Sequence, residues 1–86
     1  MSGKWYMYVV ECADGSLYTG ITTCVTRRLN EHNYSSSRGA KYTRSRRPVR
    51  LVMTKEFESH SNAASAEWKF KKLSRKRKLE IISESR

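Results

Sequence analysis

The sequence has few cysteines and no long apolar run. Its two cysteines, Cys12 and Cys24, are too few for the disulfide framework of a small secreted domain. Together with His32 and His60 they also fail as a zinc site, because no two of the four are spaced two to four residues apart. The longest apolar stretch near the start, Met7 to Val10, is far too short to span a membrane, and nothing N-terminal looks like a signal peptide. We therefore expect free thiols in a cytoplasmic protein without membrane contact.

Acidic residues are also scarce. The chain has 8 Asp and Glu against 18 Lys and Arg, which gives a formal net charge of +10. A field of this strength in so short a chain attracts polyanions, and nucleic acids bind such proteins through phosphate neutralisation and counterion release. A ribosome-associated protein, or one that is merely well solvated, is the alternative that the charge alone leaves open.

The length of 86 residues fits one domain over residues 1–86. Residues Trp5–Cys12 and Leu17–Thr22 are rich in aromatic and β-branched types and predict two strands. The segment Ala13–Ser16 between them predicts a turn in which Gly15 supplies a positive φ. A third strand is expected over Val49–Phe57, where apolar and polar residues alternate.

The remaining segments predict helices. Residues Val25–Ser35 have helical spacing, with Thr22 or Thr23 as the expected N-cap, and Tyr34–Arg47 is expected to be a basic loop. Ala63–Leu73 carries an apolar stripe, and Arg75–Ser83 follows as a last basic helix. Ser59–Asn62 and Ser74 supply capping residue types for these two helices. The sequence thus predicts an α+β fold, a small three-stranded antiparallel sheet flanked by helices in the order β-β-α-β-α-α.

The tyrosines of the first two strands provide a geometric test. Tyr8 and Tyr18 lie on the same side of the hairpin only if its loop has an odd number of residues, such as three with Gly15 in the left-handed position. A two-residue turn at Asp14-Gly15 would place them on opposite faces. Tyrosine is a common half-buried strand residue, so position alone favours a packing role.

Three further residues have types suited to catalysis. Arg28 and His32 are four residues apart, so both lie on one face of the expected helix. An arginine is suited to bind a phosphate oxygen, and a histidine can donate, accept or shuttle a proton. A solvated arginine beside a half-buried histidine is the simpler alternative. Glu67 falls within the apolar stripe, where an unpaired carboxylate is costly to bury. It must either pair with a cation, for which Arg28 is one option, or hold a metal ion at the edge of a cleft.

Two basic stretches surround these positions and predict a nucleic-acid surface. Basic residues that grip phosphates position a nucleic acid without reading its sequence, and interleaved aromatic side chains such as Tyr42 and Trp68 stack on bases. The residues expected to bind are Arg38, Lys41, Tyr42, Arg44, Arg46, Arg47, Lys71, Lys72 and Arg75.

Taken together, these residues resemble the GIY-YIG nuclease family, in particular its small stand-alone bacterial members, over nearly the whole chain. The first motif is present as Tyr6-Met7-Tyr8 and the second as Tyr18-Thr19-Gly20, ten residues after Tyr8. Arg28 and His32 follow in RRLNEH, then comes the loop segment GAKYT, and Glu67 lies in AEWKFKKL. Each motif alone is weak evidence for the family, and it is the order and spacing of the motifs together that make the resemblance strong.

The resemblance implies roles for the matching positions. Tyr18 would activate the attacking water, as general base or as a deprotonated phenol, and Arg28 would stabilise the charge that develops on the phosphate. Glu67 would hold a single Mg²⁺ or Mn²⁺ ion. Tyr8 and His32 would hydrogen-bond the water, Tyr18 or the phosphate, and Gly20 would keep the approach to the scissile group open.

The resemblance therefore implies a Mg²⁺-dependent endonuclease that hydrolyses phosphodiester bonds of DNA, in repair or processing, with RNA as another possible substrate. A non-catalytic nucleic-acid-binding module on the same fold is the alternative. Because no second domain is evident to supply target choice, we expect a monomer that relies on a protein partner or on the structure of its substrate.

Overall fold

A computed structural model describes residues 3–85 of the chain. Its centre is a three-stranded antiparallel sheet in the order β2-β1-β3, formed by β1 (Trp5–Glu11), β2 (Leu17–Thr22) and β3 (Arg50–Phe57). The helices are α1 (Val25–Tyr34), α2 (Lys41–Arg44), α3 (His60–Lys71) and α4 (Arg75–Glu84). The predicted α+β class, the antiparallel sheet and the order of the main elements are confirmed.

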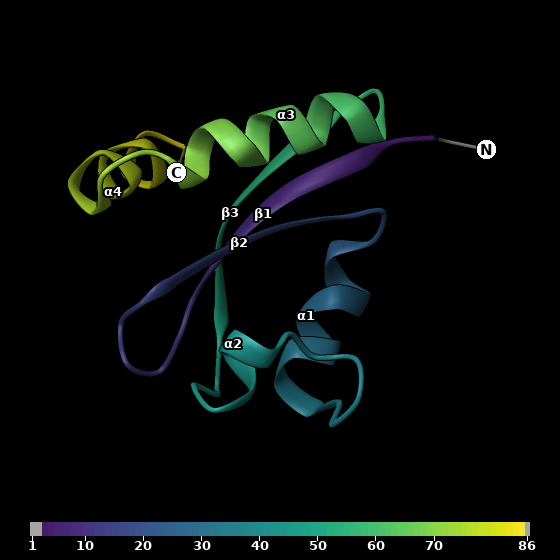
Figure 1. Cartoon of the computed structure of the whole chain (residues 1–86), viewed down its shortest axis with the longest axis vertical. Helices are drawn as coiled ribbons and strands as arrows, with labels where there is room; N and C mark the ends of the chain where they lie inside the picture. Colours follow the sequence, from purple (N-terminus) through teal and green to yellow (C-terminus); the bar gives the residue numbers. More distant parts are fainter. Residues whose placement is uncertain (1–2, 86) are drawn as a thin grey trace.

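The helices cover the two faces of the sheet (Figure 1): α3 and α4 lie on one side, and α1 and α2 on the other. Alternation along the central strand β1 sends its side chains into two cores. Met7 and Val9 pack with Phe70 and Ile82 beneath α3 and α4. On the opposite face, Tyr8, Val10, Cys12 and Val49 form a second buried cluster, against which Tyr18 and Leu29 pack. The candidate tyrosines therefore belong to the layer that α1 and α2 cover.

The basic loop expected over Tyr34–Arg47 contains an additional short helix, α2. A four-residue helix has too few residues to show a hydrophobic period, so the sequence pattern did not reveal it. The expected N-cap of α1 is also wrong, because Cys24 occupies that position without a side-chain capping bond. The Thr22 hydroxyl instead accepts a hydrogen bond from the Cys24 backbone N–H at 3.2 Å, within the turn from strand to helix.

The two C-terminal helices begin at serine caps. The Ser59 hydroxyl accepts from the Asn62 backbone N–H at 3.1 Å, so α3 begins at His60, three residues before the apolar stripe. The Ser74 hydroxyl accepts from the backbone N–H of Arg77 at 3.2 Å and starts α4. Each cap satisfies a backbone donor that the first helical turn leaves free, an arrangement that contributes about 1 kcal/mol.

Candidate active site

The hairpin of β1 and β2 places Tyr8 and Tyr18 on one face of the sheet. Tyr8 is opposite Gly20, and Val10 is opposite Tyr18. The loop has three residues, closed by a hydrogen bond from the Cys12 backbone N–H to the Ser16 carbonyl oxygen at 2.8 Å. Gly15 has φ +85°, which a side chain rarely tolerates. This is the odd-length loop that a shared face requires.

Helix α1 brings His32 against both tyrosines. His32 is completely buried, and its Nε2 lies 2.7 Å from the Tyr8 hydroxyl. Its ring also meets the Tyr18 ring edge-on, with centroids 5.3 Å apart. Burial lowers the pKa of His32 to about 4, and the nearby positive charge of Arg28 acts in the same direction. The imidazole is therefore neutral at physiological pH, and it acts in the site as a hydrogen-bonding group.

Arg28, one turn before His32 on the same helix, contacts Tyr8 and the loop. Burial alone would lower the pKa of Arg28, but hydrogen bonds to Glu31 and to Tyr8 outweigh it and raise the pKa. One guanidinium nitrogen, Nη1, donates to Glu31 at 2.9 Å and to the Arg38 carbonyl oxygen at 2.5 Å. Burial raises the pKa of Tyr8 to about 12, against the opposing effect of Arg28. Tyr8 therefore stays a neutral phenol fixed between His32 and Arg28.

Gly20 provides the space that Tyr8 occupies. A Cβ at position 20 would lie 2.5 Å from the Tyr8 hydroxyl oxygen and 2.7 Å from Cζ of the same ring. Real Cβ atoms essentially never approach other atoms so closely, and the Tyr8 ring, 2 % exposed, has little room to move. The structure thus gives Gly20 a packing reason of its own, beside the open approach to substrate that the resemblance implied.

Glu67 belongs to α3, which packs against β1 and β2 on the face of the sheet opposite to the cluster of Tyr8 and Tyr18. Its side chain is 22 % exposed, and it forms an ion pair with Lys71, one turn along α3, at 3.3 Å. The pairing with Arg28 that the sequence left open is wrong: Arg28 pairs with Glu31. Helical spacing explains this outcome, because a lysine four residues after a glutamate is its nearest cation. The Glu67 charge adds a small increase to the pKa of Tyr8, after the larger effect of burial.

The donor set fits a loosely held hard cation. Among residues 3–85, no three His, Cys, Asp or Glu side chains gather closely enough to form a metal site. One accessible carboxylate is nonetheless sufficient for Mg²⁺, which usually keeps several waters and completes its shell with substrate phosphate. Glu67, whose side chain is 22 % exposed, is the carboxylate that the resemblance assigns to this role.

Tyr42 stacks against Tyr18. Their rings stack with centroids 5.9 Å apart and an interplanar angle of 23°. The Arg46 guanidinium lies over Tyr42, 4.0 Å from the ring centroid, and its Nε donates to Asp14 of the hairpin loop at 3.1 Å. The α2 region and the hairpin loop are thereby joined around Tyr18.

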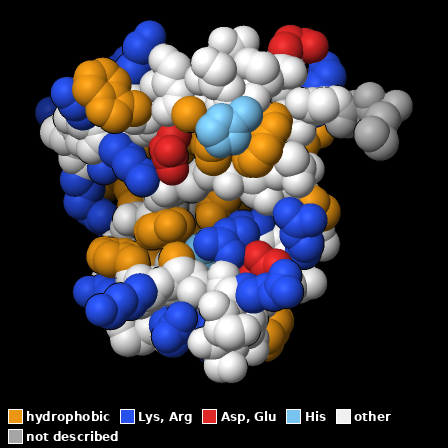
Figure 2. Space-filling view, turned by 45° about the vertical axis from the view of Figure 1, so that its right-hand side comes forward, with side chains coloured by type: hydrophobic (Ala, Val, Ile, Leu, Met, Phe, Trp, Pro, Cys, Tyr) orange, Lys and Arg blue, Asp and Glu red, His pale blue; other side chains and the backbone are white. Residues whose placement is uncertain are grey.

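The predicted nucleic-acid residues fall into two groups. Figure 2 shows Lys and Arg side chains around a hollowed surface that also presents acidic and hydrophobic side chains. Six of the predicted basic residues are exposed, namely Arg38, Lys41, Arg44, Lys71, Lys72 and Arg75. Arg46 and Arg47 are only partly exposed. The exposed cations can meet phosphates even where they have a partner in the fold, as Lys71 has in Glu67 and Arg75 has in the Gly15 carbonyl oxygen.

Arg47 is held by the C-terminal end of α1. Its guanidinium donates to the carbonyl oxygen of His32 at 2.6 Å and also to that of Ser35. These carbonyl groups lie at the C-terminal end of the helix, where no further backbone N–H groups of the helix follow to bond them. Gly39 lies against the same cluster, since a Cβ there would be 2.9 Å from the Arg47 guanidinium. This structural role of Arg47 is long-range, and no local sequence pattern could indicate it.

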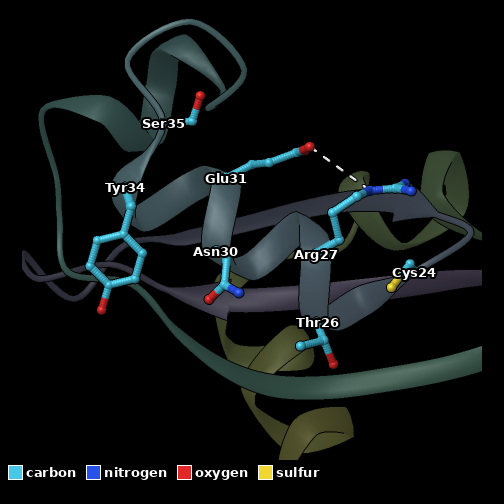
Figure 3. A pocket seen from close by; sticks show the side chains of 7 residues that line it. All are labelled: Cys24, Thr26, Arg27, Asn30, Glu31, Tyr34 and Ser35. Atoms are coloured by element: carbon cyan, nitrogen blue, oxygen red, sulfur yellow. Dashed lines mark ion pairs between the residues drawn. The ribbon is translucent and has the colours of Figure 1, made fainter.

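A separate shallow hollow of about 570 Å³ lies along α1 (Figure 3). The Arg27–Glu31 ion pair, 3.8 Å, spans part of it. Its lining residues are Cys24, Thr26, Arg27, Asn30, Glu31, Tyr34 and Ser35. It contains neither Tyr8 nor Tyr18, so we do not assign the chemistry to it. None of the helices within residues 3–85 is long and apolar enough to cross a membrane.

Comparison with known proteins points to one family. The model of the GIY-YIG catalytic domain matches residues 4–80. A UPF0213 protein of Streptococcus sanguinis is 54% identical over 98% of this chain and 94% of its own length. The UPF0213 protein DP2720 of Desulfotalea psychrophila is 52% identical over 94% of this chain and 73% of its own length.

Two solution NMR structures are also similar. The UPF0213 protein BH0048 of Bacillus halodurans has 49% identity and a TM-score of 0.60, covering 93% of this chain and 83% of that one. The protein EF2693 of E. faecalis has 46% identity and a TM-score of 0.61, covering 93% and 84%.

Proposed function

Because this chain belongs to the GIY-YIG nuclease family, we propose that it is a Mg²⁺-dependent endonuclease that hydrolyses phosphodiester bonds of DNA. The observation that carries the proposal is the contact network of the two tyrosines with α1. His32 touches both Tyr8 and Tyr18, and the positive charge of Arg28, one turn earlier on the same helix, acts on Tyr8. A nucleophile-activating group, a phosphate-binding cation and a carboxylate are the parts that this hydrolysis requires.

Tyr18 is the residue that we assign to water activation. Its ring is fixed on one side by Tyr42 and on another by the edge of His32, which leaves its hydroxyl a defined position. To accept the proton of an attacking water, Tyr18 must be a phenolate or pass its own hydroxyl proton to another acceptor. Its fixed position then avoids the entropy of bringing base and water together. Arg28 then stabilises the negative charge that develops on the phosphate, for which a guanidinium is well suited.

Glu67 is the residue that would hold the metal ion. When bound, the ion supplies a positive charge that polarises the phosphate and stabilises the leaving oxygen. The Glu67 side chain is accessible enough to accept a hydrated cation, and Lys71 neutralises it in the absence of one. We expect Mn²⁺ to replace Mg²⁺, since both prefer oxygen ligands.

The exposed cations would bind the DNA backbone on either side of the scissile phosphate. Lys71, Lys72 and Arg75 extend from the Glu67 helix into α4, while Lys41 and Arg44 lie in α2 and Arg38 precedes it. Such contacts give affinity without sequence recognition. A role in DNA repair or processing, with a partner protein that selects the target, follows as part of the proposal.

A non-catalytic binding module is the second candidate, and the Glu67–Lys71 ion pair is the observation that favours it. In a protein that only binds nucleic acid, this carboxylate needs no role beyond pairing with its neighbouring lysine. Metal dependence therefore distinguishes the two functions.

The test is nicking of branched and single-stranded DNA with and without Mg²⁺. We expect metal-dependent cleavage by the unmodified protein and its loss in both Tyr18→Phe and Glu67→Ala. Tyr34→Phe is the matched control, because Tyr34 is 81% exposed and lies in the α1 hollow away from the other tyrosines. Cleavage that survives both active-site substitutions would overturn the site assignment, and binding without any cleavage would establish the second candidate.

A further inference from the structure

Thr43 is a buried residue to which neither the motifs nor the family resemblance gives a role. It lies in the four-residue helix α2 and is completely buried. Its hydroxyl oxygen lies 2.9 Å from Nδ1 of His32 and 3.0 Å from the carbonyl oxygen of Ala40. A buried hydroxyl with two partners on its oxygen is suited to fixing the direction of the hydrogen bonds that it makes.

The proton count gives these bonds their direction. The Thr43 hydroxyl has one proton, and a carbonyl oxygen can only accept, so the bond to Ala40 uses that proton. Thr43 must then accept from His32, which requires the imidazole proton to be on Nδ1. A neutral imidazole carries a single ring proton, so Nε2 is left as an acceptor. The Tyr8 hydroxyl, 2.7 Å away, is the donor to it.

We propose that Thr43 is a positioning residue that holds His32 in the Nδ1–H tautomer and thereby makes Tyr8 a hydrogen-bond donor to His32. The chain of bonds runs in one direction, from Tyr8 to His32, from His32 to Thr43, and from Thr43 to the Ala40 carbonyl group. The outward lone pairs of the Tyr8 oxygen can then only accept.

The consequence for the site rests on the function proposed above. An oxygen whose own proton is committed to His32 can receive a proton-bearing group, such as the Tyr18 hydroxyl or the attacking water, and orient it. In the opposite tautomer, Nε2–H would donate to Tyr8 and the Tyr8 proton would point outward, where it would compete with those donors. Thr43 thus determines which groups Tyr8 is able to orient, without itself contacting the substrate.

The tautomer is measured directly by ¹⁵N NMR of the histidine ring in the intact protein, because protonated and unprotonated ring nitrogens resonate far apart. Three proteins are compared at neutral pH: the unmodified chain, Thr43→Ser, which keeps the hydroxyl, and Thr43→Val, which has the same shape without it. The only other histidine, His60, is exposed and serves as an internal reference.

We expect His32 to be an Nδ1–H tautomer in the unmodified protein and in Thr43→Ser, and to lose that single state in Thr43→Val. An Nε2–H tautomer in the unmodified protein overturns the proposal even if Thr43→Val does not fold, and so does an unchanged tautomer in a folded Thr43→Val. Where cleavage is found, we expect kcat to fall about 10-fold in Thr43→Val with KM unchanged and to recover in Thr43→Ser. Absence of cleavage by the unmodified protein would overturn the proposed function while the ring spectrum still decides the tautomer.

Discussion

Substitution of Gly20 by alanine is the sharpest test of how the tyrosines are packed. The new methyl group would lie 2.5 Å from the Tyr8 hydroxyl oxygen and 2.7 Å from the ring carbon that bears it, so the phenol must move. Overpacking of this kind costs about 1–3 kcal/mol. Displacing the hydroxyl also leaves the buried Nε2 of His32 without its partner, which costs about 1–3 kcal/mol more. Allowing for the smaller entropy loss of alanine, about 0.5–1 kcal/mol, the central values give an expected net destabilisation of about 3 kcal/mol.

The assay is urea unfolding, with thermal unfolding as a second measurement. For a domain of this size the expected loss corresponds to a decrease in Tm of about 10–25 °C. Gly3→Ala is the matched control, because a Cβ at that position meets nothing within 4 Å, and it should change stability by less than about 0.5 kcal/mol. Adding Tyr8→Phe to Gly20→Ala removes the closest clashing atom, so the double variant should be more stable than the two single losses together imply. Equal stability of Gly20→Ala and the unmodified protein would refute this packing argument.

Three further predictions concern other parts of the molecule. The pKa of His32 is lowered from 6.5 to about 4, so the unfolded chain binds a proton on this residue more readily than the folded chain does. The free energy of unfolding should therefore be highest above pH 6.5 and fall by up to about 3 kcal/mol as the pH decreases to 4. In pH-dependent urea unfolding, His32→Gln should lack this component between pH 6.5 and 5. Arg47→Lys should lower the free energy of unfolding by about 1–3 kcal/mol, since a lysine cannot serve both carbonyl groups, yet leave the salt dependence of DNA binding nearly unchanged. Lys72→Ala should leave the free energy of unfolding nearly unchanged but weaken DNA binding. In a titration of DNA affinity against salt concentration, the slope of the log–log plot should be reduced by about 1, and an unchanged slope would remove Lys72 from the binding surface.

The sequence predicted those features that depend on local pattern. Alternation identified the strands, and the stripe through Ala63 and Phe70 identified the face of α3 that packs on the sheet. A shared site for Tyr8 and Tyr18 required an odd-length hairpin loop, and the structure has one. Four-residue spacing also placed Arg28 and His32 on one helix face. These properties are determined by the periods of strand and helix, which a single sequence displays.

The sequence did not reveal features that depend on contacts between distant segments. No local pattern shows that Arg47 binds the carbonyl groups at the C-terminal end of α1, or that Thr43 contacts the ring of His32, eleven residues earlier. The partner of Glu67 was undecided for a related reason, because its i,i+4 neighbour Lys71 competes with cations that only the tertiary fold brings near. The packing of Gly20 against Tyr8 likewise depends on the pairing register of two strands.

The stereochemical course at phosphorus tests the central claim that Tyr18 activates a water molecule at this site. The measurement uses a DNA substrate whose scissile phosphate is a phosphorothioate of known configuration, cleaved by the unmodified protein in isotopically labelled water. A single in-line attack by water, the role we assign to Tyr18, predicts inversion of configuration. Retention, or a DNA strand covalently attached to Tyr18, would show two successive displacements through a tyrosine nucleophile and would contradict the account.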